Sequence, residues 1–268
     1  MGACWQVLKQ DKSLLLFPLI SGICCLMLLA SFALPLFLTN HWQPPHGSAG
    51  TPSQIAYYGV LFLFYLCNYF IIIFFNAGIV ACATIRMTGG NPTLGDGFRA
   101  AASRLPVIAG WAIISATVGL ILRLIEDRSK WIGQIVAALF GAAWTVVSFL
   151  VVPMLVIENK NPLTALKEST LLVKKTWGEQ VAGNFGFGLL TFLLALPGIG
   201  IALLGVFSGI PTVMILCIVT AVVYLIVLSL VQSALRSIFQ AAVFLYARDG
   251  QIPAGFDAEV LGNAMVRR

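Results

Sequence analysis

Hydrophobic residues in this chain gather into six long runs, and short polar segments between the runs hold nearly all of the charged side chains. The runs cover residues 14–38, 57–85, 106–125, 132–157, 181–207 and 212–246. Each run reaches the about 20 residues that a helix needs to cross the hydrocarbon core of a bilayer. Strands with open edges would have unpaired backbone groups in lipid. The pattern therefore predicts an all-α polytopic membrane protein with six transmembrane helices.

Composition supports the same class. Hydrophobic residues make up 59% of the 268 residues, charged residues only 10%, and the mean hydropathy is +0.96. An ordinary soluble domain carries about 25% charged residues. We therefore expect a single membrane domain over residues 1–268, with the first run acting as a retained signal-anchor.

The distribution of Lys and Arg predicts the orientation in the membrane, because cytoplasmic loops are enriched in these residues. If the N-terminus is cytoplasmic, three basic residues face outward, Arg123, Arg128 and Lys130, and twelve face the cytoplasm. The twelve are Lys9, Lys12, Arg86, Arg99, Arg104, Lys160, Lys167, Lys174, Lys175, Arg248, Arg267 and Arg268. Both termini are thus expected in the cytoplasm. The same enrichment of basic residues on the cytoplasmic side explains the net charge of +6. We therefore expect no nucleic acid as a partner.

A short motif recurs after the second, fourth and sixth runs, where Gly or Asn is followed three positions later by Pro. Gly89, Asn159 and Gly250 begin the three copies. Gly and Asn tolerate the left-handed conformation that ends a helix, and Pro is common just after such a cap. The motif predicts helix caps at these three residues. It also predicts internal repeats of approximately 1–92, 93–162 and 163–253, followed by an amphipathic tail at 254–268.

Amphipathic segments follow each Pro, at residues 94–105, 163–177 and 256–265, and residues 5–12 are an N-terminal counterpart. In the second segment Leu166, Val173 and Trp177 form an apolar stripe beside three lysines that can reach lipid phosphates. The chain is therefore interpreted as three helical hairpins, each preceded by an interfacial amphipathic helix.

The stretch GGNPTLGDGF at residues 89–98 resembles a phosphate-binding loop only superficially. A P-loop needs Lys after its last Gly and a preceding strand, whereas here Asp96 follows Gly95. We interpret the stretch as a turn.

Polar side chains inside the runs are the candidates for function, because such residues are costly at membrane depth. They are Asn68 and Asn76 in the second run and Ser229, Gln232, Ser233, Arg236, Ser237 and Gln240 in the sixth. One interpretation is a polar cavity that opens to the cytoplasm and suits an anion, a lipid headgroup or water. The other is hydrogen bonding between helices, with Arg236 extending to the interface.

The fifth run contains Pro197-Gly198-Ile199-Gly200, an interruption of the kind found in discontinuous transporter helices. Kinking for helix packing is the alternative. Gly205 and Gly209 also form a GxxxG motif.

Enzymatic chemistry is not indicated. The runs contain no His and no pair of carboxylates, and the six cysteines include no CxxC motif. We therefore predict no catalytic residues, no cofactor and no metal site. The expected partners are membrane lipids, further copies in a homo-oligomer, and other envelope proteins.

Three segments resemble a bacterial family of polytopic membrane proteins of unknown function. They are FFNAGIVACATIRMTGGNPTLGDGFRAA, GWAIISATVGLILRLIED and VVPMLVIENKNPLTALKESTLLVKKTWGEQVAGN. The amphipathic helix that leads into a hairpin is also similar to the membrane domains of some bacterial glycerophosphodiester phosphodiesterases. The resemblance implies a bacterial inner-membrane location and a six-helix fold. We expect a non-enzymatic protein that forms a channel, a transport-like cavity or a lipid-accommodating cavity, or alternatively a scaffold for other envelope proteins.

Overall fold

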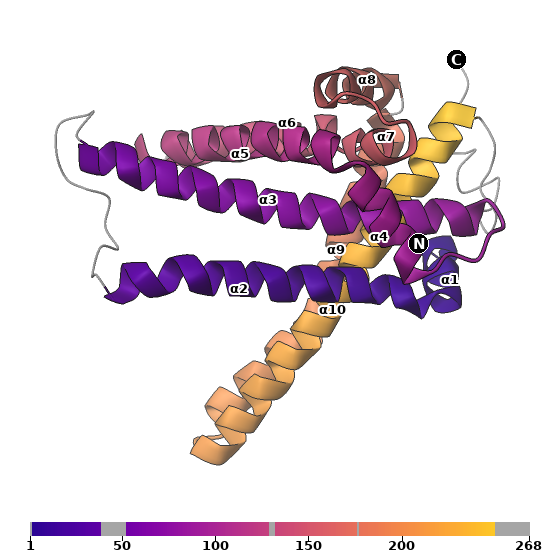
Figure 1. Ribbon diagram of the computed structural model, residues 1–268. Coiled ribbons are helices and arrows are strands. Elements are labelled where there is room, and N and C mark those ends of the chain that lie inside the picture. Colours follow the sequence, from indigo (N-terminus) through magenta and orange to yellow (C-terminus); the bar gives the residue numbers. More distant parts are fainter. Residues whose placement is uncertain (1, 39–51, 129–131, 176, 250–268) are drawn as a thin grey trace.

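The computed structural model describes residues 2–38, 52–128, 132–175 and 177–249, and this part of the chain is helical with no strand (Figure 1). Six of its segments are long and apolar enough to cross a membrane. They are Lys12–Pro35, Ile55–Met87, Leu105–Glu126, Gly133–Ile157, Leu190–Phe207 and Pro211–Arg248. The predicted all-helical fold with six candidate membrane spans is confirmed. Gly250 and the tail at 254–268 lie outside the described residues.

The helices divide into long apolar ones and short ones. The long helices are α2 (Leu16–Leu38), α3 (Pro52–Met87), α5 (Leu105–Arg128), α6 (Ile132–Val147), α9 (Trp177–Phe207) and α10 (Pro211–Asp249). The short ones are α1 (Gly2–Gln10), the 3-10 helix η1 (Lys12–Leu15), α4 (Leu94–Ser103), α7 (Val151–Ile157) and α8 (Pro162–Lys175). Consecutive long helices pack together, α2 on α3, α5 on α6 and α9 on α10, and α3 also contacts α4, α5, α7 and α10.

The short helices gather at the end of the molecule where the N-terminus and the last turns of α10 lie (Figure 1). With Phe17 at the start of α2, residues 148–150, residues 73–87 of α3 and residues 234–245 of α10 they form what we term the packed end. Its fully buried large side chains include Phe17, Phe149 and Phe244. Side chains buried in this way make close van der Waals contacts on all sides. The hydrophobic core of the protein is therefore located mainly at one end of the helices.

Gly97 lets α4 approach α3 closely within the packed end. A Cβ at this position would lie 2.5 Å from the ring of Phe17, 2.7 Å from Cys82 Sγ and 3.0 Å from the Gly78 carbonyl oxygen. Side chains do not tolerate such distances, so only glycine fits here without rearrangement.

The remainder of α9 and α10 extends away from the packed end (Figure 1), and residues 190–233 are termed the exposed hairpin. Leu204, Phe207 and Leu216 are 72%, 82% and 67% exposed. The two helices nevertheless contact each other closely: Tyr224 donates a hydrogen bond of 2.7 Å to the Leu194 carbonyl, and Gly198 and Gly205 pack against Tyr224 and Cys217. An apolar surface of this extent is suited to lipid surroundings.

The fifth run forms one helix that continues through Pro197, so it is not a discontinuous helix. The fourth run differs from the sequence interpretation. It is divided into α6 and α7 at residues 148–150. There the Ser169 hydroxyl of α8 accepts a hydrogen bond from Leu150 N at 3.2 Å and donates one to the Val147 carbonyl at 2.6 Å. A buried side chain from another helix thus satisfies backbone groups at the break.

The apolar stripe of α8 also lies differently from the expectation. Val173 is buried and Leu166 partly buried against the hydrophobic core, rather than facing lipid. The side of α8 that is exposed carries Leu163, Lys167, Leu171 and Lys174. The side chain of Trp177 lies outside the described part.

Candidate functional site

The predicted polar residues of α10 fall into two groups by their hydrogen bonds. Ser237 is buried and its hydroxyl donates to the Ser233 carbonyl at 2.9 Å, while the Ser229 hydroxyl donates to the Ile226 carbonyl at 2.7 Å. Both hydroxyls are therefore satisfied by their own helix. Gln232 also has an interaction partner.

The second group consists of Ser233, Arg236 and Gln240, which we term the polar face. Spacings of three and four residues place them on one side of α10. Ser233 and Arg236 are exposed and Gln240 is half-buried. Within the described part of the chain, none of their side chains forms a hydrogen bond or an ion pair. The polar face therefore offers unused hydrogen-bonding groups, including a permanent positive charge.

The two amides of α3 are separate from this group. Asn68 and Asn76 are both half-buried, and the Oδ1 atom of Asn76 is enclosed without a hydrogen-bond partner. An unpaired buried acceptor carries a desolvation cost. No hydrogen bond joins either amide to the polar face among the described residues. A cavity shared by Asn76 and Arg236 stays a prediction.

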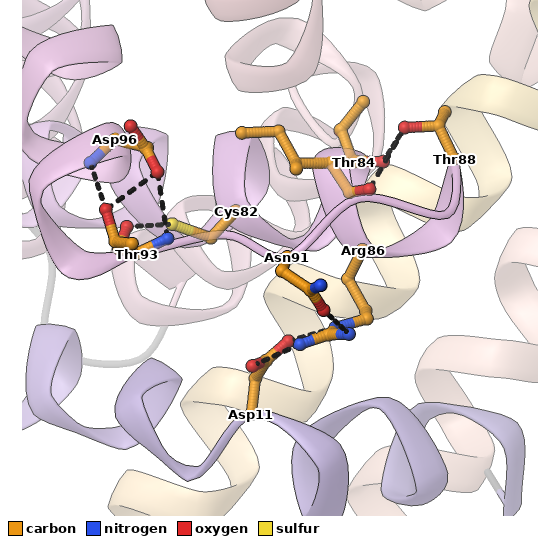
Figure 2. Close-up of polar contacts among 9 residues, drawn as sticks. Asp11, Cys82, Thr84, Arg86, Thr88, Asn91, Thr93 and Asp96 are labelled. Atoms are coloured by element: carbon orange, nitrogen blue, oxygen red, sulfur yellow. Dashed lines mark hydrogen bonds and ion pairs between the residues drawn. The ribbon is translucent and has the colours of Figure 1, made fainter.

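An ion pair that the sequence interpretation missed ties the N-terminal segment to the end of α3 (Figure 2). Asp11, buried between α1 and η1, accepts hydrogen bonds from Nε and Nη2 of Arg86, the second at 2.6 Å. The Nη1 atom of Arg86 donates to Asn91 Oδ1 at 2.7 Å. This Asp11 cluster occupies all three guanidinium nitrogens of Arg86. Three of the five N–H groups of Arg86 are thus used within the cluster.

The turn at residues 89–98 ends one helix and begins the next, as Figure 2 shows. Gly89 has a φ of 90°, the left-handed conformation that the cap motif requires, and Asn159 at the second copy has a φ of 53°. Thr93 and Asp96 form a capping box in which Asp96 N donates to Thr93 Oγ1 at 3.2 Å and Thr93 N donates to Asp96 Oδ2 at 2.9 Å. The hydrogen bond from the Thr93 hydroxyl lowers the pKa of Asp96.

A second set of charges links α7 to α8. Lys160 forms ion pairs with Glu158, at 2.6 Å, and with Glu168. The Glu158 Oε2 atom is close to Lys160 Nζ but outside hydrogen-bonding geometry, so the two groups form an ion pair without a hydrogen bond. The contacts with Glu158 and then Glu168 raise the pKa of Lys160. These groups satisfy one another and form a structural link.

Chemistry by thiols or metals has little support in the described part of the chain. No group of three or more His, Cys, Asp or Glu residues is placed there to hold a metal ion. Cys4 is buried in α1, and burial raises the pKa of its thiol to about 11. The thiolate needed for nucleophilic attack is therefore scarce at neutral pH.

Comparison with known families identifies a family for most of the chain. A model of a family of unknown function matches residues 55–256, which run from the start of α3 to beyond α10. No curated protein and no solved structure matches the chain. The similarity to membrane domains of glycerophosphodiester phosphodiesterases therefore stays a prediction. The polar face and Arg86 lie inside the matched region, and Asp11 lies outside it.

Proposed function

The chain belongs to the DUF6159 family of unknown function, and on that premise we propose that it forms a polar cavity for a transported solute or a lipid. In this proposal the protein is a non-enzymatic homo-oligomer of the bacterial inner membrane. The observation that supports it is the polar face, where Ser233, Arg236 and Gln240 are without partners within the described chain.

Arg236 carries the only permanent charge of the polar face. An unpaired arginine is costly in contact with lipid tails, by about 2.5–3.5 kcal/mol at the centre of a membrane helix on insertion scales, and near a helix end it avoids this cost by reaching water or headgroups. Arg236 is exposed and has no partner among the described residues. Its environment in the membrane must therefore supply water or hydrogen-bond acceptors. A hydrated cavity, open between copies or toward the cytoplasm, would supply both.

The proposed layout has three hairpins with both termini in the cytoplasm, and interfacial helices precede the hairpins. The position of α1, α4 and α8 at one end of the long helices supports it (Figure 1). The short elements α1, η1, α4 and α8 carry five exposed basic residues, Lys9, Lys12, Arg99, Lys167 and Lys174. Their charges would then face the inner leaflet, where anionic lipids attract basic residues.

A scaffold that organises other envelope proteins is the second candidate, and the exposed side of α8 favours it. Leu163 and Leu171 are 66% and 57% exposed, beside Lys167 and Lys174. Neither lysine forms an ion pair within the described chain, whereas Lys160 is paired with two glutamates. Such a mixed surface could contact a membrane or a protein.

Flux of anions and neutral solutes through sealed proteoliposomes distinguishes the two candidates. For a cavity, wild-type protein should conduct, and Arg236→Gln should change anion selectivity while the protein still folds. Arg99→Gln is the matched control, because it removes one exposed positive charge from α4. Asn76→Leu is the second probe. Membranes that stay tight with wild-type protein, or equal flux in all variants, would contradict the cavity.

A further inference from the structure

The number of uncharged residues that precede Arg236 in α10 indicates how deep Arg236 lies in the bilayer. The α9–α10 turn lies at residues 208–210, and α10 has no charged residue from Pro211 to Leu235. About 20 helical residues cross a hydrocarbon core of about 30 Å. If the turn lies at one boundary, the opposite boundary falls near residues 231–233. Arg236 then lies just beyond the hydrocarbon, where lipid phosphates are found.

Helical geometry brings the groups of the polar face together. Side chains lean toward the N-terminus of their helix, so the guanidinium of Arg236 extends over the turn that carries Ser233. Gln240 lies one turn further along the same side. The three side chains together provide guanidinium, hydroxyl and amide donors, and the net charge is positive. This combination favours an anion with several acceptor oxygens.

The described chain contains no anion available for this role. Among the elements that pack on α10, Asp11 is already paired with Arg86 and Glu158 with Lys160. Arg236 itself forms no ion pair there. The acceptor therefore does not come from the described side chains.

We propose that Ser233, Arg236 and Gln240 bind the phosphate group of a membrane lipid. This inference rests on the proposed function, since it names the occupant of the same polar face. The planar guanidinium can donate two parallel hydrogen bonds to phosphate oxygens, and Ser233 and Gln240 can donate to the remaining oxygens or to the headgroup. The lipid tails would lie along the apolar surface of the exposed hairpin.

Native mass spectrometry of the protein in detergent, titrated with phosphatidylglycerol, tests this binding. Wild-type protein should retain a bound lipid that Arg236→Gln binds about tenfold more weakly, which corresponds to about 1.4 kcal/mol. Arg236→Lys should fall between them, because it keeps the charge but loses the planar pair of donors. Gln240→Leu should show a smaller loss, and the control Arg123→Gln, which removes an exposed positive charge that the proposed layout places at the opposite membrane face, should show none.

Two further probes identify the source of the phosphate. Diacylglycerol with the same acyl chains lacks the phosphate and should bind equally weakly to wild type and Arg236→Gln. Inorganic phosphate at millimolar concentration should leave lipid binding unchanged; displacement of the lipid would assign the site to a dissolved anion and overturn the lipid assignment. Equal lipid affinity in wild type and Arg236→Gln would also overturn it. Flux through proteoliposomes is measured in a separate experiment. Anion-selective flux through a protein that binds no lipid would contradict the lipid assignment but would leave the proposed cavity intact.

Discussion

The packed end and the exposed hairpin both contain large apolar side chains and use them in opposite ways. Phe149 in the packed end is 2% exposed, whereas Phe207 at the end of α9 is 82% exposed. The packed end also contains most of the long-range polar contacts, including the Asp11 cluster, the Ser169 hydrogen bonds and a bond of 3.3 Å from Arg104 Nε to the Val156 carbonyl. The exposed hairpin is held mainly by contacts between its two helices.

This difference shows that hydrophobicity alone does not indicate where a membrane protein is internally packed. Lipid tails are as apolar as leucine, so transfer from lipid into a helix interface gains little hydrophobic energy. Close packing and satisfied polar groups must supply the specificity. In this chain both are concentrated at the packed end.

Truncating one phenylalanine in each region is the strongest test of the comparison. Phe149→Ala should lower the free energy of unfolding by about 3 kcal/mol or more, because it leaves a cavity in the core. Phe207→Ala should change it by less than about 0.5 kcal/mol. Denaturant titration in mixed micelles measures both values. A large cost for Phe207→Ala would show that a second molecule covers the hairpin.

Loss of the Asp11 cluster should give the next largest effect. Asp11→Ala removes the carboxylate and leaves the largely buried Arg86 guanidinium without its anion, at a cost of about 2 kcal/mol. The control is Arg123→Ala, which removes an exposed pair with Glu126 at 3.5 Å and should cost about 0.5 kcal/mol or less. The same titration tests both variants, and equal losses would show that Asp11 has no special role.

Glycine substitutions sharpen the comparison at the level of helix contacts. Gly97→Ala should cost about 1–3 kcal/mol by overpacking against Phe17 and Cys82, whereas Gly95→Ala on the same helix meets only Thr93 Oγ1 at 3.6 Å and should be neutral or stabilising. The thermal midpoint of the detergent-solubilised protein reports both changes. Similar midpoints for the two variants would contradict the close approach of α3 and α4.

The smallest effect is expected at the cap between α3 and α4. Gly89 has a positive φ with open space around its Cα, so Gly89→Val should cost about 1 kcal/mol from backbone strain alone. Asn159→Gly at the second cap should be neutral or slightly stabilising. The thermal midpoints of both variants, compared with that of the wild type, measure these changes. A Gly89→Val protein with the same midpoint as the wild type would show that the positive φ at this residue imposes no strain on valine.

The sequence predicted the features that depend on local pattern. Six apolar runs correspond to six candidate spans because length and composition determine them. The turn at Gly89 follows from the conformational freedom of glycine. The Asp11–Arg86 pair joins residues 75 positions apart, and no local pattern connects them.

The break in the fourth run was missed for a related reason. Residues 148–150 are Ser-Phe-Leu, without Gly or Pro to mark an interruption. Ser169, a distant side chain, stabilises the break. Pro197-Gly198 had the local signal, yet the helix continues there and Gly198 provides space for Tyr224. For the candidate site, the sequence alone identified the polar residues of α10. The exposure and the hydrogen bonds of these side chains in the structure then separated the polar face from the other polar residues of the helix.

The hydrogen bonds of Ser169 have a consequence for biosynthesis. The ribosome makes the chain from the N-terminus, so residues 147 and 150 emerge before Ser169 does. Until α8 docks, the Leu150 N–H and Val147 carbonyl lack this partner, and an unpaired backbone group in an apolar setting costs about 1–3 kcal/mol. The fourth span therefore reaches its final shape only after the segment that follows it has been translated.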